Sequence, residues 1–279
     1  MNNFHMCGGL PRSGSTLLMN ILQQNPGIFT TGTCALYEIL QEKILIKSRY
    51  SETFQAMSSE QADKAMYGLV HGATKGWFEA LTDKPTVISK RHGWSNLFHL
   101  FPQSKYICLV RDLRDVVESF ESVNKKTLAL HSYSNAGTFI PSMHVHEKYK
   151  YYFEEANALS GNLYTEIPRL MEIFKQGSGK VIFIRYEDLT KEPLYILDKL
   201  YKFLNEKSFD HNLMNIAQSE LVEHDHAYFR EKTDHTTLPE FRYYTEPNRK
   251  LPDAFHKRVV DENKWFYEAF YPEVLNNER

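Results

Sequence analysis

The sequence predicts an α/β fold in which a parallel sheet lies between two layers of helices. Short apolar runs alternate with longer amphipathic stretches, and polar or charged residues that open a helical pattern follow each run. No repeat of 20–50 residues, low-complexity tract or Pro/Gly/Ser linker divides the chain. Such alternation is typical of parallel strands joined by crossover helices. We therefore expect one three-layer domain over residues 1–279.

Five apolar runs are candidates for buried strands. In chain order they are Phe4–Cys7, Gly27–Thr31 (the weakest), Thr86–Ser89, Tyr106–Val110 and Val181–Arg185. Each is short and mostly apolar, as expected for strands that are buried on both faces. Ligands of such sheets bind beyond the carboxyl ends of the strands, so the residues after each run are the first candidates for a site.

Apolar residues at helical spacing follow three of these runs. The stretches are Leu17, Leu18, Ile21 and Leu22; then Val116, Val117 and Phe120; then Leu194, Leu197, Leu200, Tyr201 and Leu204, behind Pro193 at a first helical position. Residues 131–153 and 224–250 are rich in His and show no clear periodicity. Long irregular segments of this kind are typical of lids and substrate walls.

Composition limits the classes of function. The 279 residues carry 33 Lys+Arg against 35 Asp+Glu, a formal charge of -2, which argues against a nucleic-acid partner or a polybasic membrane surface. Three cysteines without a CxxC pair argue against a disulfide scaffold or a cysteine-based zinc site. No apolar run is long enough to span a membrane, and only Met1 to His5 precede or begin the first strand. We expect a soluble, cytoplasmic enzyme.

The loop after the first run has the features of an anion-binding site. It reads Gly9-Leu-Pro-Arg12-Ser13-Gly14-Ser15-Thr16, and an amphipathic helix follows. Backbone N–H groups and the dipole at a helix N-terminus favour bound anions. The Gly-x4-Gly spacing matches the Walker A loop, but Ser15 stands where that loop requires Lys, and Arg12 supplies the charge instead. This departure argues against an ordinary nucleoside-triphosphate hydrolase or kinase.

Basic residues also follow two later runs. Arg111 ends the run Tyr106–Val110, where its guanidinium can direct two donors at a phosphate, and Ser119 lies eight residues further on. Lys90 and His92 follow the run Thr86–Ser89 in the sequence. This position brings a fixed cation and a titratable base to the same edge of the sheet. The last run continues into Arg185-Tyr186-Glu187-Asp188.

The residues after Arg111 have a simpler interpretation. For Arg114, Asp115 and Glu118 we expect a solvated helix start. Asp112 would be its cap, and Arg114 and Glu118 would form an i,i+4 pair.

Together the four stretches resemble the sulfotransferases that use 3′-phosphoadenosine 5′-phosphosulfate (PAPS). GLPRSGST is similar to their 5′-phosphosulfate loop and LVRDLRDVVES to their 3′-phosphate motif. ISKRHGW is similar to the Lys-x-His step of the cytosolic branch, and IRYEDL to a late Tyr-Glu-Asp element. The matched residues 4–24, 86–122 and 180–204 follow the family's order and spacing. The resemblance implies a P-loop-like sulfotransferase fold and transfer of a sulfuryl group from PAPS to a hydroxyl or amine.

The resemblance also implies roles for single residues. The first loop would hold the 5′-phosphosulfate through Pro11, Arg12, Ser13, Gly14, Ser15 and Thr16. Lys90 would reach the leaving phosphate or the sulfuryl group, Arg111 and Ser119 would hold the 3′-phosphate, and Tyr186 would lie near the adenosine. Arg249 and Lys250 would be the basic residues of a late loop, although the glycine that the cytosolic branch has beside it is absent.

Two residues are candidates for the general base. His92 stands where cytosolic members place it, whereas other branches use a Glu shortly after the first helix. Glu38 is the nearest such residue here, at a shifted position, so His92 is the first choice. Fixed cations would stabilise charge on the departing phosphate, so no metal is required. The short pairs His144/His146 and His224/His226 lack ligand companions, and a pocket wall or surface loop is the simpler interpretation.

Two other functions are compatible with the motifs. One is a P-loop kinase of a nucleoside or small alcohol, and the other is a non-catalytic nucleotide-binding relic of the same fold. The acceptor can be a tyrosine side chain, a sugar hydroxyl, a lipid headgroup or a small metabolite.

Overall fold

A five-stranded parallel sheet forms the centre of the computed structural model, which describes residues 2–32, 34–40, 51–91, 93–127, 144–155, 157–218, 238–245 and 248–276. Its strand order is β2-β3-β1-β4-β5. The strands are β1 (Asn3–Gly9), β2 (Ile28–Thr31), β3 (Thr86–Lys90), β4 (Tyr106–Val110) and β5 (Val181–Arg185). All five runs that the sequence predicts as strands are therefore confirmed.

Helices fill most of the remaining described chain. Before β4 they are α1 (Ser15–Leu22), α2 (Ala35–Glu38), α4 (Glu52–Ala56) and α5 (Ser59–Glu79), with 3₁₀ turns η2 (Trp94–Asn96) and η3 (Phe98–Leu100). Between β4 and β5 lie α6 (Leu113–Thr127), α7 (Val145–Tyr149), α8 (Ala158–Gly161), α9 (Ile167–Lys175) and the π-helical turns η5 (Lys150–Glu154) and η6 (Asn162–Glu166). After β5 come α10 (Tyr186–Lys191), α11 (Pro193–Leu204), α13 (Asp253–Glu262), α14 (Lys264–Phe270) and α15 (Pro272–Asn276).

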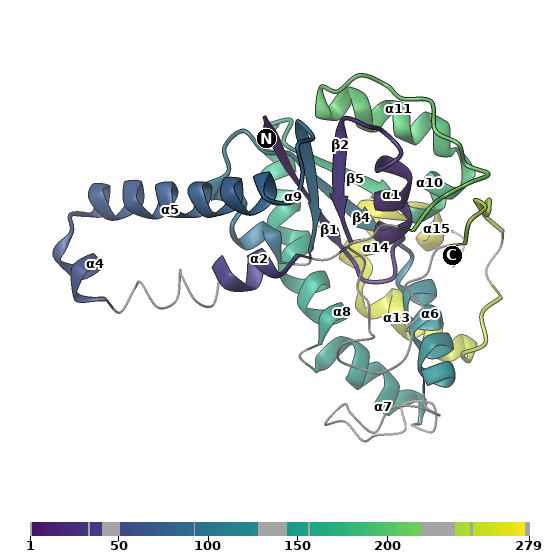
Figure 1. Ribbon diagram of the computed structural model, residues 1–279. Coiled ribbons are helices and arrows are strands. Elements are labelled where there is room, and N and C mark those ends of the chain that lie inside the picture. The colour runs from purple at the N-terminus through teal and green to yellow at the C-terminus, as the bar shows by residue number, and fades with distance from the viewer. Residues whose placement is uncertain are drawn as a thin grey trace.

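The sheet is buried on both faces, as the apolar runs require. Alternate residues of a strand point to opposite faces, so Met6 and Cys108 pack in one apolar cluster and Cys7 and Ile107 in another. Helices α1 and α11 cover the second cluster, and α5, α6, α9, α13 and α14 contribute to the first (Figure 1). The predicted three-layer α/β arrangement is confirmed.

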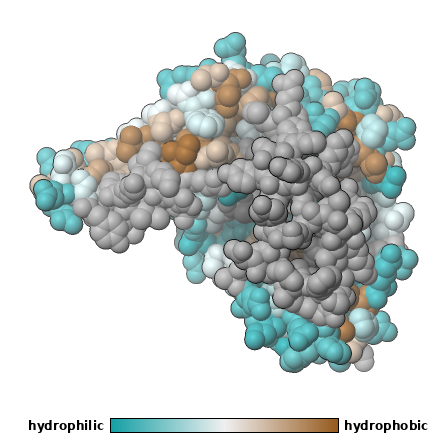
Figure 2. Space-filling view, turned by 60° about the horizontal axis from the view of Figure 1, so that its bottom comes forward, coloured by the Kyte–Doolittle hydropathy of each residue, from teal (hydrophilic) through white to brown (hydrophobic). Residues whose placement is uncertain are grey.

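Helix α5 extends beyond the sheet as an arm, with α4 at its outer end (Figure 1). A capping box begins the helix, because the Ser58 hydroxyl accepts from Gln61 N–H and the Gln61 side chain accepts from Ser58 N–H. Large apolar side chains are exposed on α5, among them Tyr67 at 43% and Leu69 at 45%. Hydrophobic surface is visible along the arm in Figure 2. In the sequence, the arm directly precedes β3.

The strand order creates a crevice at the carboxyl edge of the sheet. Strand β1 lies between β3 and β4, so the chain that leaves β1 turns towards β2 and the chain that leaves β4 turns towards β5. Where two such connections diverge, an open parallel sheet has its ligand crevice. The ends of β1, β3, β4 and β5 therefore supply the candidate site, as the sequence predicts.

Candidate active site

The loop after β1 is a tight turn that ends in a helix N-terminus. Three of its residues have positive φ: Gly9 at 110°, Arg12 at 60° and Gly14 at 84°. Ser13 is fully buried, and its hydroxyl donates to the carbonyl of Leu10 at 2.5 Å, which closes the loop on itself. Alternation into the left-handed region turns successive N–H groups towards one side. The first turn of α1 adds N–H groups that have no acceptor within the helix. The loop thus has the backbone of an anion cradle.

Lys90 lies at the helix end of this loop. It is the last residue of β3, opposite Cys7 of β1, and is 5% exposed. Its Nζ donates to the Thr16 hydroxyl at 3.0 Å, while its N–H donates to the Thr31 hydroxyl at 3.2 Å. The ammonium is therefore fixed beside the first turn of α1, as the strand-end position predicts.

Arg12, Arg111 and Ser119 meet on the other side of the loop. The Nε of Arg12 donates to the Ser119 hydroxyl at 3.0 Å, and the Nη1 of Arg111 donates to the Arg12 carbonyl at 2.9 Å. Although 107 residues separate Arg12 from Ser119, the end of β1 and the first turns of α6 place them in contact. The structure therefore brings together the residues that the sequence assigns to two different phosphates.

Tyr186 forms one wall of the same region. The Arg111 guanidinium lies 4.4 Å above the centroid of its ring, a cation–π arrangement. A Cβ at Gly14 would lie 2.6 Å from the ring, so only glycine fits there. Tyr186 therefore joins the glycine loop to the Arg111 side chain at the end of β4.

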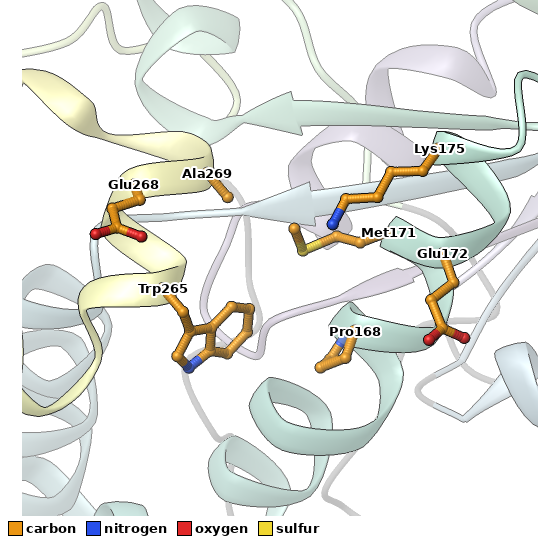
Figure 3. A pocket seen from close by; sticks show the side chains of 7 residues that line it. All are labelled: Pro168, Met171, Glu172, Lys175, Trp265, Glu268 and Ala269. Atoms are coloured by element: carbon orange, nitrogen blue, oxygen red, sulfur yellow. The ribbon is translucent and has the colours of Figure 1, made fainter.

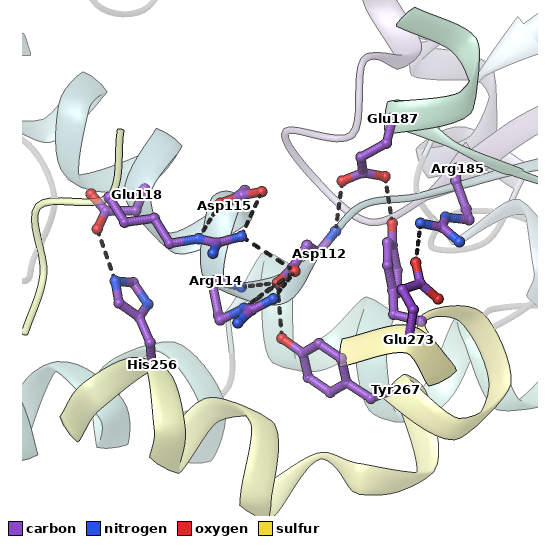
Figure 4. Close-up of polar contacts among 11 residues, drawn as sticks. Asp112, Arg114, Asp115, Glu118, Arg185, Glu187, His256, Tyr267 and Glu273 are labelled. Carbon is purple, nitrogen blue, oxygen red and sulfur yellow. Dashed lines mark hydrogen bonds and ion pairs between the residues drawn. The ribbon is translucent and has the colours of Figure 1, made fainter. Parts of the chain in front are cut away.

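The start of α6 is buried, which contradicts the predicted solvated helix start. Asp112 is 4% and Asp115 3% exposed. Arg114 pairs with Asp112 at 2.6 Å, and no Arg114–Glu118 pair occurs among the described contacts. Tyr267 of α14 also donates to Asp112 at 3.0 Å (Figure 4). Helices from the C-terminal part of the chain cover these residues, and nothing in the local sequence indicates that cover.

Asp112 does cap α6, as predicted. Its Oδ1 accepts from the N–H of Arg114 at 3.0 Å. Burial by itself would raise the pKa of Asp112, but hydrogen bonds from Arg114 and the charges of Arg114 and Arg249 lower it. The N–H of Asp112 in turn donates to Glu187, which also accepts from Tyr271 at 2.7 Å (Figure 4). These contacts join the ends of β4 and β5 to the C-terminal helices.

The late loop with Arg249 and Lys250 lies against α6. The Nε of Arg249 donates to Asp115 at 2.8 Å, and its Nη2 is 3.4 Å from Asp112. The N–H groups of Lys250 and Leu251 donate to Glu118 at 2.6 and 2.7 Å. In this structure the Arg249 guanidinium is thus paired with carboxylates on the helix that carries Ser119.

The two candidate bases are not positioned by the structure. His92 lies outside the described residues, between Arg91, whose N–H donates to the Cys7 carbonyl at 3.0 Å, and Gly93. Glu38 is the last residue of α2. Of the histidines that invited a metal interpretation, His224 and His226 also lie outside the described residues. Within the described ranges, no three His, Cys, Asp or Glu side chains are grouped so as to hold a metal ion.

Glu166 is a residue of this region that sequence reasoning missed. It ends η6, is 2% exposed, and accepts hydrogen bonds from the Tyr106 hydroxyl and from the N–H of Gly93 at 3.3 Å. Burial raises its pKa to about 7, against the hydrogen bonds from Tyr106, Gly93 and Gly9, which lower it. It belongs to no motif, so no signal in the sequence marks it.

A hollow of about 540 Å³ opens elsewhere on the described surface, between α9 and α14 (Figure 3). Its lining combines apolar and charged side chains, namely Pro168, Met171, Glu172, Lys175, Trp265, Glu268 and Ala269. None of these is among the residues that the sequence assigns to the site. No helix in the described parts of the chain is long and apolar enough to cross a membrane.

Comparison with known proteins agrees with this fold. The model of the sulfotransferase family matches residues 6–211, so this chain belongs to that family. The match and the parallel sheet together confirm the predicted α/β sulfotransferase fold. A search of the curated proteins found no match.

Several solved structures are similar to this chain. The sulfotransferase domain from the curacin biosynthetic pathway is 18% identical, with a TM-score of 0.49 over 94% of this chain and 97% of that one. Sulfotransferase STF9 from Mycobacterium avium is 13% identical, with a TM-score of 0.49 over 97% of this chain and 77% of that one. A sulfotransferase from Alicyclobacillus acidocaldarius is 15% identical, with a TM-score of 0.48 over 76% and 84%.

Proposed function

We propose that this chain is one catalytic domain that transfers a sulfuryl group from PAPS, in line, to a hydroxyl or amine acceptor. The observation that carries the proposal is the meeting of Arg12, Lys90, Arg111, Ser119 and Tyr186 around one glycine loop at the crevice of the sheet. Membership of the sulfotransferase family supports the reaction class. The number and spread of cations suit a donor that carries phosphates at two positions.

The cradle and Lys90 would act on the reacting end of the donor. PAPS supplies a mixed anhydride of phosphate and sulfate, and negative charge grows on the departing phosphate as the sulfuryl group leaves. The N–H groups of residues 12–16 and the Lys90 ammonium would stabilise that charge, because they are already oriented before reaction. We propose that these fixed donors stabilise the charge on the departing phosphate without a metal ion.

Arg111 and Ser119 would fix the other end of the donor. Both lie beside Arg12, within hydrogen-bond distance of its carbonyl or guanidinium. A phosphate placed there would exchange these internal partners for stronger charge-assisted bonds. Tyr186, whose ring lies against Gly14, would support the adenine or ribose. Holding both ends restricts the donor to one orientation, which lowers the barrier through positioning.

The acceptor proton requires a base, and we propose His92 for this role, with Glu38 as the alternative. Imidazole has a reference pKa of about 6.5, which suits proton abstraction near neutral pH. Positioned general bases contribute roughly 10²–10⁴-fold to a rate.

Binding of adenosine 3′,5′-bisphosphate (PAP), the product of the donor, tests the proposal directly. Isothermal calorimetry should show that Arg111→Ala weakens PAP binding about 10- to 100-fold, as expected for loss of a charge-assisted bond, and weakens adenosine 5′-phosphate binding much less. Arg258→Ala is a matched control, because Arg258 also stacks on a tyrosine ring, at 3.8 Å from the Tyr149 centroid, but belongs to α13. It should leave both affinities unchanged.

Each alternative function has its own outcome in the same set of measurements. An equal loss of affinity for both nucleotides in Arg111→Ala would refute the 3′-phosphate role. If the chain does not bind PAP but transfers phosphate from ATP in the presence of Mg²⁺, it is a kinase. A chain that binds PAP, yet transfers no sulfuryl group to phenols, sugars or amines, would be a binding protein of this fold.

A further inference from the structure

Glu166 joins two segments of the crevice that are far apart in the sequence. It ends the π-helical turn η6, and α9 begins at the next residue. Single π-helical turns are rare and occur frequently at functional sites. Here the turn directs a carboxyl group beneath the carboxyl ends of β1 and β3.

The carboxyl accepts from both of those ends. The N–H of Gly93, in the turn that follows β3, donates to Oε1 at 3.3 Å. The backbone of Gly9, the last residue of β1, also hydrogen-bonds to the carboxyl. The Tyr106 hydroxyl donates to the same Oε1 from β4. One side chain thus accepts from residues at the ends of two strands and from the strand beside them.

The carboxyl lies close against the backbone of β1. A Cβ at Gly8 would lie 2.3 Å from the Tyr106 hydroxyl, 2.8 Å from Glu166 Oε1 and 3.2 Å from the Arg91 carbonyl. Gly8 is therefore required for the approach of the carboxyl to β1. Gly8 leaves space for the Glu166 carboxyl, and the backbone of Gly9 hydrogen-bonds to it. The anion loop begins at the same Gly9.

The same two segments carry the reacting end of the proposed site. Gly9 leads into the anion loop, and Gly93 follows Lys90 and Arg91 along the chain. A shift of either glycine would change the separation between the loop and the Lys90 ammonium, which now meets Thr16 at 3.0 Å. A displacement of about 1 Å in a reacting group can cost about 10²-fold in rate.

We propose that Glu166 is a positioning residue, whose buried carboxyl holds the anion loop and the turn after Lys90 at the separation that sulfuryl transfer requires. The inference rests on the proposed function, because it assigns a catalytic consequence to that separation. Glu166 itself is enclosed and contacts the backbone of both segments, so it acts through them.

Titration of Glu166 gives a readout that does not depend on activity. The folded pKa of about 7 lies above the reference of 4.5, so between these values the folded chain keeps a proton that the unfolded chain has lost. The free energy of unfolding of the wild type should therefore fall, relative to Glu166→Gln, as pH rises from 4.5 to 7. The titratable or charged groups around the carboxyl are Cys7 of β1, Tyr106 and Cys108 of β4, Arg91 after β3, Tyr37 of α2 and Arg169 of α9.

Three variants separate positioning from general stability. Glu166→Gln keeps an oxygen acceptor and should retain kcat within about threefold, whereas Glu166→Ala should lose about 10-fold or more in kcat with little change in PAP affinity. Glu206→Ala is the matched control, because its Oε1 accepts from Thr86 at 2.5 Å and Asn3 at 3.0 Å, at the opposite ends of β3 and β1. It should lower the free energy of unfolding and leave kcat unchanged.

The outcomes keep this inference apart from the proposed function. If wild type binds no PAP and transfers no sulfuryl group, the function fails, and the pH dependence of unfolding and hydrogen exchange at Gly93 still test the placement of the carboxyl. If wild type is active and Glu166→Ala keeps wild-type kcat, or loses it only as much as Glu206→Ala, positioning is wrong. Parallel stability curves for wild type and Glu166→Gln between pH 4.5 and 7 would also overturn it.

Discussion

Lys90 shows how much one side chain at a strand end depends on its neighbours. The Lys90 residue is 5% exposed. Its ammonium donates to the Thr16 hydroxyl at 3.0 Å. The Arg114 and Arg249 guanidinium groups pair with carboxylates at the start of α6. Lys90 is the cation that we propose for chemistry, because it ends β3 beside the anion loop.

Lys90→Ala should lower kcat by roughly 10²–10³-fold and change PAP affinity little, because the ammonium is needed most as charge grows on the departing phosphate. A coupled assay of PAP release with saturating donor measures kcat, and calorimetry measures the affinity. Lys84→Ala is the matched control, since Lys84 lies just before the same strand and donates to the Ile28 carbonyl at 2.9 Å. An equal loss of kcat in both variants would contradict the assigned role.

The residues of the site differ in how well the sequence predicts them. Lys90 and Arg111 were predicted because each directly follows an apolar run, and the carboxyl ends of parallel strands meet at one edge. Arg12 was predicted because it lies in the glycine loop after the first run. Glu166 was not, because its partners are mainly backbone groups from distant segments, and a backbone donor leaves no mark in the sequence. The local sequence shows a residue's type and its position relative to a strand. Whether a charged side chain is buried depends on packing between segments that are distant in the sequence.

At the scale of elements, α6 connects the crevice to the C-terminal part of the chain. Ser119 accepts a hydrogen bond from Arg12. Asp115 and Glu118 accept hydrogen bonds from Arg249 and Lys250 of the late loop. The amphipathic pattern of α6 predicted the helix correctly but not what covers it. The carboxylates near its start were wrongly expected in water, because their partners lie more than 130 residues further along the chain.

Glu118→Ala should free the late loop from α6. The variant loses the acceptor of two backbone N–H groups and of His256 Nε2 at 3.2 Å, so a loss of about 1–3 kcal/mol in the free energy of unfolding is expected. Hydrogen exchange at Lys250 and Leu251 should accelerate at the same time. Glu60→Ala removes an exposed i,i+4 pair with Lys64 on α5 and should cost less than about 1 kcal/mol. Unchanged exchange at both amides would show that Glu118 does not hold the loop.

At the scale of the whole molecule, the sheet and its order position the site. The strand runs predicted the α/β class because strands buried on both faces need continuous apolar stretches. The arm formed by α4 and α5 was not predicted, since only Val70, Thr74 and Phe78 of α5 are buried and the rest lacks an apolar face that packs on the sheet. A helix with so few buried residues gives a weak periodic signal.

A ligand held by four strand ends should stabilise the entire fold. At a PAP concentration of about 100 times its dissociation constant, the free energy of unfolding should rise by about 2.7 kcal/mol, which raises the melting temperature by several degrees. Differential scanning calorimetry measures the shift, and adenosine 5′-phosphate at the same concentration is the comparison and should give less. A PAP shift no larger than that of adenosine 5′-phosphate would argue against a clamp at both phosphates.

The strand order also has a consequence for synthesis of the chain. Strand β1 pairs only with β3 and β4 in the described sheet, so its backbone groups stay without ladder partners until residues near 86 have been made. At a translation rate of about 5–20 residues per second, that interval lasts roughly 4–15 s. During it, the apolar segment Phe4–Cys7 is open to chaperones, and a ribosome-bound fragment that ends before β3 has no sheet in which to place it.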